Sequence, residues 1–525
     1  MSPCYKQAPK AKGKLCRGPV VLLIWDGFGY SKNKAGNAVM AAKMPNWHHL
    51  WGNHLHTLLK ADGPAVGLPV GETGNSEAGH STLGAGRPVV SDKVKINKTI
   101  SKKIFEDNPA FTQAALHVLR RNSTLHLIGM LTNHQSGHAD FGHILASVEF
   151  AKRLKLPKVA LHLFTDGRDT APYHASKLLL ELERHLTPNM RIATIMGRFY
   201  AMDRDRNWKR TELAYNCMCL GQGVVAETPI QAIEQAYARG ESDEFMLPTV
   251  ITYDSQKPVT VNHHDAVIFW NLRSDRARQM VKPFIQKEFA RRNKHAFTRQ
   301  KFCQDMYFAT MTEFGKQIDG AVPAFPHHEL SCTLVEALRS KRQIYIAESE
   351  KYSQVTYFFN GGYDTPKFDE ERVRIQSIRT AALEKHPRMK APEVAKAVIS
   401  AVKKKYDFVC ANFANADMIG HTGDFEATVK ACEALDEPLG KIWQAVKQAN
   451  GCLMITADHG NAEQLFGAHG ERDTQHNPNP VPFLICCASK DKKLKVGTLA
   501  DVAPTILAAL CVSQPDEMKG RNLLS

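Results

Sequence analysis

Four segments of the chain carry Asp and His residues of the kind that bind hard divalent metal ions. The residues are Asp26, Asp417, His421, Asp458, His459 and His476. Asp417 and His421 are four residues apart, so both would lie on one face of a helical turn. Asp458 and His459 follow an apolar run and could turn toward a shared site. An Asp-Gly pair is usually a turn and a single His is usually structural, but four such segments together favour a metal site.

The ligand types indicate which metals and which chemistry the site would suit. Mixed carboxylate and imidazole ligands favour Mn²⁺, Mg²⁺, Co²⁺ or Zn²⁺ over a soft metal. Two such ions a few ångströms apart are what phosphoryl transfer uses to hold the attacking and leaving oxygens. The metal motifs therefore predict phosphoryl transfer, for which the chain must also supply a nucleophile.

A serine surrounded by glycines, Ser76, is the best candidate for that nucleophile. It lies in Gly71–His80, which reads Gly-Glu-Thr-Gly-Asn-Ser-Glu-Ala-Gly-His and is predicted to open a short helix. A free hydroxyl is a poor nucleophile, and the segment has neither a Ser-x-x-Lys pair nor a G-x-S-x-G elbow to activate it. Coordination to a metal ion is the remaining route. The competing interpretation is that Asn75, Ser76 and Glu77 only cap a helix.

The elements that would position these residues alternate between strand and helix. Short apolar runs predict strands at Pro19–Trp25, Val159–Phe164, Ile192–Met196, Val267–Trp270, Phe408–Asn412 and Cys452–Thr456. A helix is predicted from residue 425 onward, with an apolar face made by Phe425, Val429, Cys432, Leu435, Leu439, Ile442 and Val446. The alternation predicts an α/β fold with mostly parallel sheets. Since ligands bind at the carboxyl ends of such strands, Asp26, Asp166 and Asp458 are expected near the chemistry.

The length of the chain predicts more than one domain. At 525 residues it exceeds what one hydrophobic core usually serves. Pro88 and the segment Pro323–Pro326 are the predicted linkers. Residues 1–88 and 324–525 hold the Asp/His motifs, whereas residues 89–323 are rich in arginine motifs. We therefore expect one discontinuous domain with a second α/β domain inserted into it.

Composition argues against several other classes of protein. No apolar run approaches the ~18 residues that span a bilayer, so no membrane partner is expected. Twelve cysteines without a C-x-x-C pair predict neither a disulfide framework nor a thiolate zinc site, which fits a reducing cytosol. A net charge of +15 could suit a nucleic-acid-binding protein. However, basic runs such as Lys403–Lys405 lack interleaved aromatics, and no zinc-finger spacing is present, so no nucleic-acid partner is expected.

Together, the motifs resemble those of the cofactor-independent phosphoglycerate mutases of the alkaline phosphatase superfamily. The resemblance runs from about Val20 to the end of the chain. It is carried by Trp25–Gly27, Gly74–His80, Asp166–Asp169, Gly197–Asp205, Asn271–Ala277, Glu348–Tyr352, Ala416–His421, Thr456–Asn461 and His476. It implies an alkaline-phosphatase-like domain that is split in sequence, an inserted domain that grips the substrate, and two hinges that join them.

The resemblance also implies a role for each motif residue. One metal ion would be held by Asp26, Ser76, Asp458 and His459, and the other by Asp417, His421 and His476. The substrate would contact His138, Arg168, Asp169, Arg198, Arg204, Arg273, Arg276 and Lys351. Two divalent ions are therefore expected, with Mn²⁺ favoured and Mg²⁺ or Co²⁺ as alternatives. The expected partner is phosphoglycerate alone, converted by a cytoplasmic monomer.

These residue types suit a substrate that carries both a phosphate and a carboxylate. Guanidinium groups bind both bidentately and keep their charge. Asp169, beside Arg168, is the best candidate for a general acid and base at the glycerate hydroxyls, and Lys351 could stabilise charge on the transferring phosphoryl group. The hypothesis is that Ser76 takes the phosphoryl group from 3-phosphoglycerate and returns it to the 2-hydroxyl of a retained glycerate. Domain closure would exclude water while Ser76 carries the phosphoryl group. The conversion would be a step of glycolysis and gluconeogenesis.

One stretch departs from the family pattern. Around the substrate histidine many members read Ser-Asp-Gly-Gly-Val-His-Ser, whereas residues 132–140 here read Thr-Asn-His-Gln-Ser-Gly-His-Ala-Asp. His138 is aligned with the family histidine because His143 keeps the register, and His134 is the alternative. The competing function is a plain metallophosphatase or sulfatase of the same superfamily. The arginine-rich insert favours a mutase, since a hydrolase need not retain its alcohol product.

Overall fold

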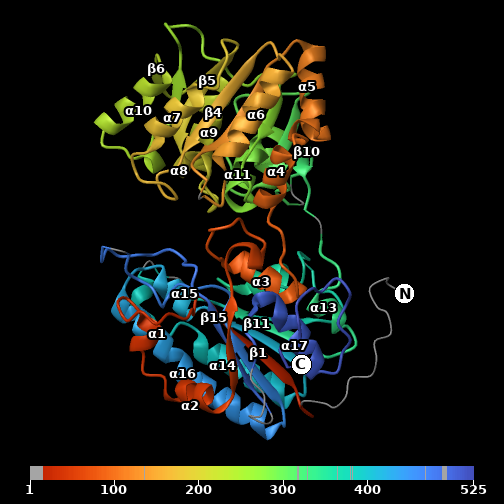
Figure 1. The fold of residues 1–525 in the computed structure, drawn as a ribbon. Coiled ribbons are helices and arrows are strands. Elements are labelled where there is room, and N and C mark those ends of the chain that lie inside the picture. Colours follow the sequence, from red (N-terminus) through yellow and green to blue (C-terminus); the bar gives the residue numbers. More distant parts are fainter. Residues whose placement is uncertain are drawn as a thin grey trace. The chain divides into compact units, whose positions relative to one another are not determined.

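The chain divides into two compact units, each with its own sheet and hydrophobic core. The computed structural model describes residues 16–134, 136–315, 318–327, 329–363, 365–378, 380, 382–467, 469–487 and 494–524. Unit 1 comprises Met1–Ser91 and His328–Ser525, and unit 2 comprises Asp92–His327. Figure 1 shows that each unit consists of a sheet with helices on its faces. The α/β fold class predicted from the sequence is confirmed.

Unit 1 contains an eight-stranded sheet whose central strands are parallel. The strand order is β12-β11-β13-β1-β14-β15-β2-β16. Strands β12, β11, β13, β1 and β14 run parallel, whereas β15 is antiparallel to both of its neighbours. The strands are β1 (Val20–Trp25), β2 (Leu55–Lys60), β11 (Gln343–Glu348), β12 (Glu371–Ile375), β13 (Phe408–Phe413), β14 (Cys452–Thr456), β15 (Val481–Cys486) and β16 (Gly497–Thr498). Because β1 lies between β13 and β14, the residues that follow these three strands meet at one edge of the sheet.

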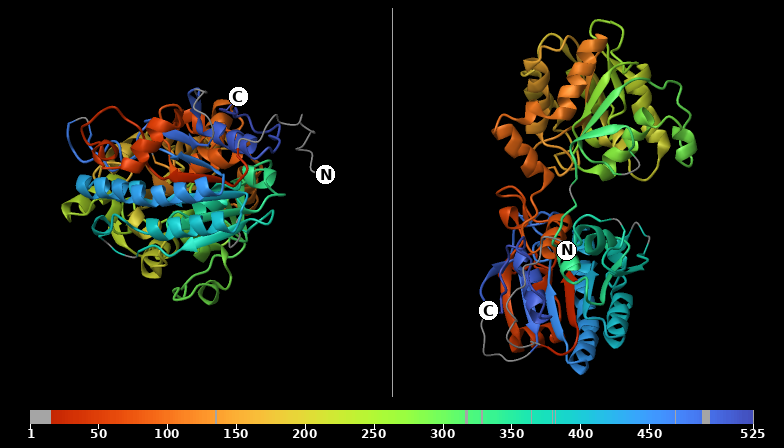
Figure 2. Two further views of the ribbon diagram at one scale, coloured as in Figure 1. Left: turned by 90° about the horizontal axis from the view of Figure 1, so that it is seen from below. Right: turned by 90° about the vertical axis from the view of Figure 1, so that its right-hand side faces the viewer.

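Helices cover the sheet of unit 1. They are α1 (Ala38–Ala41), α2 (Pro45–Asn53), α3 (Ser76–Ala85), α13 (Leu334–Ala337), α14 (Ala391–Lys403), α15 (Asn415–Gly420), α16 (Phe425–Gln448) and α17 (Val502–Ala509). Shorter turns are η1 (Gly63–Val66), η4 (Gln354–Phe358), η5 (Leu383–Lys385) and η6 (Leu499–Asp501). The two long helices α14 and α16 lie side by side, as Figure 2 shows. The predicted helix from residue 425 is confirmed as α16, and Leu435, Leu439 and Ile442 of its apolar face are buried.

Unit 2 contains a second, mostly parallel sheet of eight strands. Its order is β10-β9-β8-β3-β4-β5-β7-β6, and the one antiparallel pair within it joins β5 to β7. The strands are β3 (Leu125–Leu131), β4 (Val159–Thr165), β5 (Met190–Gly197), β6 (Val224–Ala226), β7 (Thr249–Ile251), β8 (Ala266–Phe269), β9 (Tyr307–Thr312) and β10 (Ala321–Phe325). The helices are α4 (Asp92–Ser101), α5 (Pro109–Arg121), α6 (Phe141–Arg153), α7 (Ala175–Glu183), α8 (Arg198–Ala201), α9 (Trp208–Leu220), α10 (Pro229–Ala238), α11 (Ser274–Ile285) and α12 (Phe289–Arg292), with the turns η2 (Phe105–Asp107) and η3 (Asp243–Phe245).

The observed linkers differ in detail from the predicted ones. The units meet at Ser91/Asp92 and at His327/His328, whereas boundaries were expected at 88/89 and 323/324. Residues 323–325 belong to strand β10 and not to a linker. Pro323 is tolerated there because β10 is the edge strand of its sheet, where a missing N–H removes no ladder bond on the open side.

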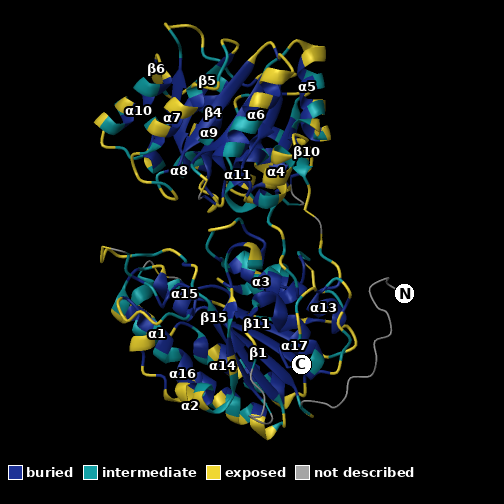
Figure 3. Cartoon of the chain, viewed as in Figure 1, coloured by how far each residue is buried: buried dark blue, intermediate teal, exposed yellow. Residues whose placement is uncertain are grey.

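Burial follows the layers of each unit. The central strands of both sheets are almost wholly buried, whereas β2, β10 and β12 are partly exposed, and most other exposed residues lie on the outer faces of helices and in loops (Figure 3). None of the described helices is both long and apolar enough to cross a membrane. Ten of the described cysteines carry free thiols. Cys332, by contrast, is disulfide-bonded, although the sequence predicted no disulfide framework.

Candidate functional site

The carboxyl ends of β1 and β14 bring the first three predicted metal ligands together. Asp26 directly follows β1, and Asp458 with His459 follows β14, its neighbour in the sheet. All three side chains are fully buried. One ligand atom from each lies within 4.8 Å of the others. The His459 Nε2 atom is 3.5 Å from Asp26 Oδ1 and 3.4 Å from Asp458 Oδ2. This edge of the sheet is where parallel-sheet proteins place their ligands.

Ser76 joins this group from the start of helix α3. Its hydroxyl lies 3.2 Å from Asp26 Oδ1 and 3.0 Å from His459 Nε2. The N-cap of the helix is Asn75, whose side chain accepts a hydrogen bond from the Ala78 N–H. Since Asn75 caps the helix, the Ser76 hydroxyl is available for the site.

The second group lies beside the first and comprises Asp417, His421 and His476. Asp417 lies in α15, and His421 immediately follows that helix, so the predicted helical turn is confirmed. Asp417 Oδ1 is 3.2 Å from His421 Nε2 and 3.3 Å from His476 Nε2, and the two histidine nitrogens are 3.1 Å apart. These three atoms form a nearly equilateral triangle.

The triangle fits a divalent metal ion. Ligand atoms bonded to an ion at about 2.1 Å lie roughly 3.0–3.4 Å from one another in octahedral or tetrahedral geometry. His421 Nδ1 is 2.8 Å from the Thr474 carbonyl oxygen, and His476 Nδ1 is 3.0 Å from that of Gly74. A ring nitrogen that faces a carbonyl must carry the proton, so in the neutral rings both Nε2 atoms present lone pairs. Two lone pairs and a carboxylate oxygen that converge in this way could hold a divalent cation.

Lys351 lies between the two groups. Its ammonium is 2.6 Å from Asp26 Oδ1, 2.6 Å from Asp417 Oδ2 and 2.8 Å from the Ser76 hydroxyl. Although burial opposes its charge, the carboxylates of Asp26 and Asp417 raise the pKa of Lys351 well above its usual value. The sequence predicted Lys351 as a substrate contact, and in the structure its ammonium is within hydrogen-bonding distance of the candidate nucleophile, Ser76.

The ionisation of the buried Asp458 carboxylate depends on the histidines around it. Burial alone would raise the pKa of Asp458, but His459 and His80 hold it well below its usual range. Burial alone would lower the pKa of His459, but Asp458 and the hydrogen bond to Asp26 raise it to about 9. The Asp458 carboxylate is therefore ionised at neutral pH, as a metal ligand must be.

Close packing of the backbone keeps the two groups together. A Cβ atom on Gly79 of α3 would lie 2.5 Å from the Asp458 carbonyl oxygen. Gly27 has a positive φ of 70°, and a Cβ there would lie 2.7 Å from Asp417 Cβ. Both positions require glycine because a side chain would push apart the segments that hold the ligands.

In unit 2, the end of β4 holds an arginine–carboxylate network. Arg198 is almost fully buried and pairs with Asp166 at 2.6 Å and with Asp169 at 3.2 Å. Burial alone would raise the pKa of Asp169, but Arg198 and the hydrogen bond from Ser136 lower it. Asp169 is therefore a carboxylate at neutral pH, able to accept a proton. Asp166 also fixes the backbone around Asp169, because it accepts hydrogen bonds from the Thr132 hydroxyl and from the Asp169 N–H.

His138 lies among the same cationic groups. Burial, then Arg273 and Arg198, lower the pKa of His138 to about 3, so its imidazole is neutral at pH 7. Its Nδ1 atom is buried without a hydrogen-bond partner among the described residues. The alternative, His134, has 71% of its side chain exposed and pairs with Asp140. These positions favour His138 over His134 as the substrate histidine.

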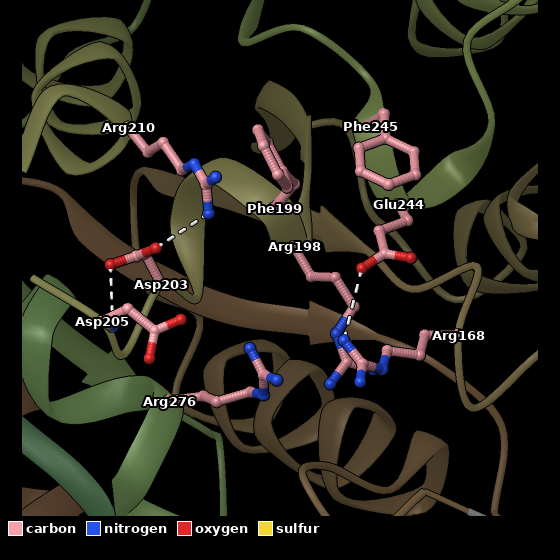
Figure 4. A pocket seen from close by; sticks show the side chains of 9 residues that line it. All are labelled: Arg168, Arg198, Phe199, Asp203, Asp205, Arg210, Glu244, Phe245 and Arg276. Carbon is pink, nitrogen blue, oxygen red and sulfur yellow. Dashed lines mark hydrogen bonds and ion pairs between the residues drawn. The ribbon is translucent and has the colours of Figure 1, made fainter. Parts of the chain in front are cut away.

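A cavity of about 200 Å³ opens beside this network. It is lined by Arg168, Arg198, Phe199, Asp203, Asp205, Arg210, Glu244, Phe245 and Arg276. The guanidinium groups of Arg168, Arg198 and Arg276 lie near one another, whereas that of Arg210 pairs with Asp203 (Figure 4). Burial, then Arg204 and Arg198, lower the pKa of Arg276 to about 10. The charge of Arg276, which the neighbouring guanidinium groups disfavour, would be stabilised by an anionic ligand.

Asp275 holds the remaining predicted arginines of unit 2. It accepts a hydrogen bond from Arg204 at 3.1 Å, and Arg273 Nε is 3.7 Å from its other oxygen. The side chains of Arg204, Arg273 and Arg168 are about half exposed, at 50%, 44% and 56%. All eight predicted substrate residues except Lys351 thus belong to unit 2.

Several site residues escaped the sequence analysis. They are His80, Asn412 and Asn461 in unit 1 and Ser136 and Asp275 in unit 2, each of which contacts a predicted site residue. Asn461 donates to Asp417 Oδ1 at 2.9 Å, and Asn412 donates to Asp26 Oδ2 at 2.7 Å. His80, Asn461 and Asp275 lie inside the motifs that carry the family resemblance, and this position in the sequence could have indicated a role in the site. Asn412 ends a predicted strand and gave no signal of its own.

Comparison with known proteins identifies the family. The model of the metalloenzyme superfamily matches residues 18–514. The chain is 42% identical over 516 residues to the 2,3-bisphosphoglycerate-independent phosphoglycerate mutase of Clostridium acetobutylicum, with 97% of this chain and 100% of that protein covered. It is 42% identical over 511 residues to the protein of the same name from Acetivibrio thermocellus, with 96% and 99% covered.

A solved structure agrees in fold. The chain resembles a crystal structure described as Leishmania mexicana phosphoglycerate mutase at low cobalt concentration, with a TM-score of 0.79, 27% identity, and 99% and 98% of the two chains covered. The match extends over both units. This chain therefore belongs to the metalloenzyme superfamily and, within it, to the family of the 2,3-bisphosphoglycerate-independent phosphoglycerate mutases.

Proposed function

We propose that this chain interconverts 3-phosphoglycerate and 2-phosphoglycerate through a phosphoserine on Ser76, without 2,3-bisphosphoglycerate. The observation that carries the proposal is the surroundings of the Ser76 hydroxyl, which lies 3.0 Å from His459 Nε2, 3.2 Å from Asp26 Oδ1 and 2.8 Å from Lys351 Nζ. A serine oxygen held this close to metal-ligand types and an ammonium is suited to attack phosphorus. The names of the relatives support the choice of substrate.

The proposed cofactors are two divalent metal ions, with Mn²⁺ favoured and Mg²⁺ or Co²⁺ as alternatives. Asp26, Ser76, Asp458 and His459 would hold one, and Asp417, His421 and His476 the other. When bound, the ions would lower the cost of negative charge on the serine and phosphoryl oxygens. The cobalt named for the Leishmania mexicana structure supports a divalent ion, and the mixed O and N ligands of this chain suit the same metals.

The residues of unit 1 perform the transfer itself in this proposal. The ammonium of Lys351, 2.8 Å from the Ser76 hydroxyl, stabilises negative charge as the serine oxygen attacks and again as the phosphoryl oxygens develop charge. The P–O bond to the 3-oxygen of glycerate breaks as the bond to Ser76 forms. In the second half of the cycle the 2-oxygen of glycerate attacks the phosphoserine, and Ser76 is the leaving group.

The residues of unit 2 bind and orient glycerate. Arg168, Arg198 and Arg276, which line the cavity, provide fixed positive charge for the carboxylate and the phosphate. Asp169, ionised at neutral pH, takes the proton of the glycerate 2-hydroxyl as that oxygen attacks the phosphoserine. In the first half of the cycle the Ser76 hydroxyl releases one proton and the departing 3-oxygen takes one up, and in the second half the Ser76 oxygen regains a proton as it leaves. His138, neutral at pH 7, can hydrogen-bond to a glycerate oxygen without adding charge to the site.

The direct test is an assay of purified protein with 3-phosphoglycerate alone. 2-Phosphoglycerate should form without added bisphosphoglycerate, and a chelator should abolish its formation until Mn²⁺ is restored. Release of inorganic phosphate in place of 2-phosphoglycerate would indicate a hydrolase of the superfamily instead. Turnover that is indifferent to the chelator would refute the metal assignment. The oligomeric state and the compartment stay predictions from the sequence, namely a monomer in the cytoplasm.

A further inference from the structure

We infer that His80 and Asn412 form a positioning pair that fixes Asp26 and Ser76 in the geometry that binds one of the two proposed metal ions. The inference rests on the proposed function, because it concerns the ligands assigned there. Neither residue touches the reacting atoms in this assignment. Their role is to act through Asp26, Ser76 and Asp458, which come from three different elements of unit 1.

His80 connects helix α3 to the end of β14. It is fully buried and lies four residues after Ser76 on the same face of α3. Its Nδ1 atom is 2.9 Å from the Ser76 carbonyl oxygen and 3.1 Å from Asp458 Oδ2. One imidazole edge therefore faces both the segment that carries the nucleophile and a proposed metal ligand.

Asn412 connects the opposite edge of the His80 ring to Asp26. It is fully buried near the end of β13, which pairs with β1. Its amide nitrogen donates to Asp26 Oδ2 at 2.7 Å and lies 3.1 Å from His80 Nε2. The amide cannot be turned around, because its oxygen would then lie 2.7 Å from a carboxylate oxygen.

The orientation of the amide determines where the His80 proton resides. Both hydrogens of the Asn412 amide are used, one on Asp26 and one on His80 Nε2. Nε2 is thus the acceptor, and Nδ1 carries the proton and donates it to the Ser76 carbonyl oxygen, while Asp458 Oδ2 lies 3.1 Å from Nδ1. Asn412 thus donates to both Asp26 and His80, and His80 in turn donates to the Ser76 carbonyl oxygen, so hydrogen bonds connect all four residues.

The cost of the arrangement supports a role in positioning. The side-chain amide oxygen of Asn412, Oδ1, is buried without a hydrogen-bond partner among the described residues. An unpaired buried oxygen is unfavourable, and an apolar side chain of similar size would avoid it. The amide is therefore retained for its two donors. The equivalent support for the second metal group is Asn461, whose amide donates to Asp417 Oδ1 at 2.9 Å.

The two asparagines allow a reciprocal test. Asn412→Leu removes both donors near the first group, and Asn461→Leu removes the donor to the second. Partners of this kind typically contribute about 10- to 100-fold to metal affinity. Titration of metal-free protein with Mn²⁺, followed by electron paramagnetic resonance of the free ion, should show one of two sites weakened by about this factor in Asn412→Leu. The other site should be weakened in Asn461→Leu.

His80 provides a conservative variant as a second measurement. In His80→Asn the amide nitrogen can occupy the position of Nδ1 and donate as before, whereas His80→Leu removes donor and acceptor. The Mn²⁺ affinity should fall in the order wild type, His80→Asn, His80→Leu. Equal affinity in the two variants would contradict the hydrogen-bond chain.

Gln343→Leu controls for a general loss of stability. Gln343 is a fully buried amide in β11 of the same unit, and its amide nitrogen donates to the carbonyl oxygens of Val335, Leu338 and Phe368. The Mn²⁺ affinities of the Gln343→Leu variant should equal those of the wild type. The inference fails if Asn412→Leu binds both ions as the wild type does, or loses no more affinity than Gln343→Leu. Failure of the metal assignment itself is distinguishable, because Asp458→Ala would then leave Mn²⁺ binding unchanged.

Discussion

Single residues decide the chemistry of this chain, and the Ser76 hydroxyl is the clearest case. Its position depends on Asn75, which caps α3 and leaves the serine oxygen toward Asp26 and His459. The sequence indicated the serine because its glycines and the neighbouring metal motifs are unusual. It could not indicate Asn412, because a buried amide at the end of a strand has no spacing pattern that separates it from a structural residue.

Replacing Lys351 should affect both stability and turnover. Lys351→Met leaves Asp26 and Asp417 without the ammonium that lies 2.6 Å from each. Removing one partner of a buried pair costs about 3–5 kcal/mol, so urea unfolding in the presence of chelator should show a loss of this size. The rate kcat should fall by roughly 10²- to 10³-fold. Lys441→Met, which removes an exposed pair with Glu437, is the control and should cost less than about 1 kcal/mol. An unfolding free energy equal to that of the control would contradict the assigned contacts.

The depressed pKa of His138 predicts acid sensitivity. Its pKa is about 3 in the folded protein, whereas the pKa of a histidine in an unfolded chain is about 6.5. Between these values the unfolded chain binds more protons, so stability rises with pH there and is lost as the pH falls from 6.5 toward 3. His138→Gln should therefore reduce the difference in urea unfolding free energy between pH 7 and pH 4.5. His134→Gln, at an exposed side chain, should leave it unchanged. The same loss in both variants would show that His138 is not the cause.

Helices and strands place these residues with little tolerance. Predicted strands such as Cys452–Thr456 were confirmed because a buried parallel strand reads as a continuous apolar run. The segment Pro323–Pro326 was misassigned as a linker because proline is rare in strands, and only the sheet order reveals that β10 lies at an edge. The approach of α3 to β14 could not be predicted either, since it depends on which glycine faces the strand end.

Gly79 tests that approach. In Gly79→Ala the new Cβ would lie 2.5 Å from the Asp458 carbonyl oxygen, so α3 must shift away from the ligands. We expect the variant to lose about 1–3 kcal/mol of unfolding free energy, as overpacked sites do, and most of its activity. Gly52→Ala in α2 is the matched control, because nothing lies within 4 Å of a Cβ there. That change should be neutral or stabilise the protein by about 0.5–1 kcal/mol. Full activity in Gly79→Ala would show that α3 need not lie so close.

At the scale of the whole molecule, the chain separates its chemistry between two units. The proposed metal ligands, Ser76 and Lys351 belong to unit 1, and the proposed substrate arginines with Asp169 belong to unit 2. The alternation of strand and helix was enough to predict the α/β class. The division of the motifs suggested an inserted domain, but the positions of its ends depend on contacts that the sequence does not display.

Unit 2 should fold by itself if it is a domain. Asp92–His327 has its own sheet and its own hydrophobic core. A fragment of these residues should unfold cooperatively in urea and show the near-ultraviolet circular dichroism of packed aromatics. It should have no mutase activity, because it lacks Ser76. A fragment without a cooperative transition would mean that the two units depend on each other for stability.

The central claim is that Ser76 carries the phosphoryl group. Metal-loaded protein would be mixed with 3-phosphoglycerate, quenched in acid within milliseconds, and digested for mass spectrometry of the peptide that contains Ser76. We predict a phosphoryl group on Ser76 in the wild type, and no 2-phosphoglycerate from Ser76→Ala at any enzyme concentration. Mutase activity retained in Ser76→Ala, or a phosphoryl group found on another residue, would contradict the account.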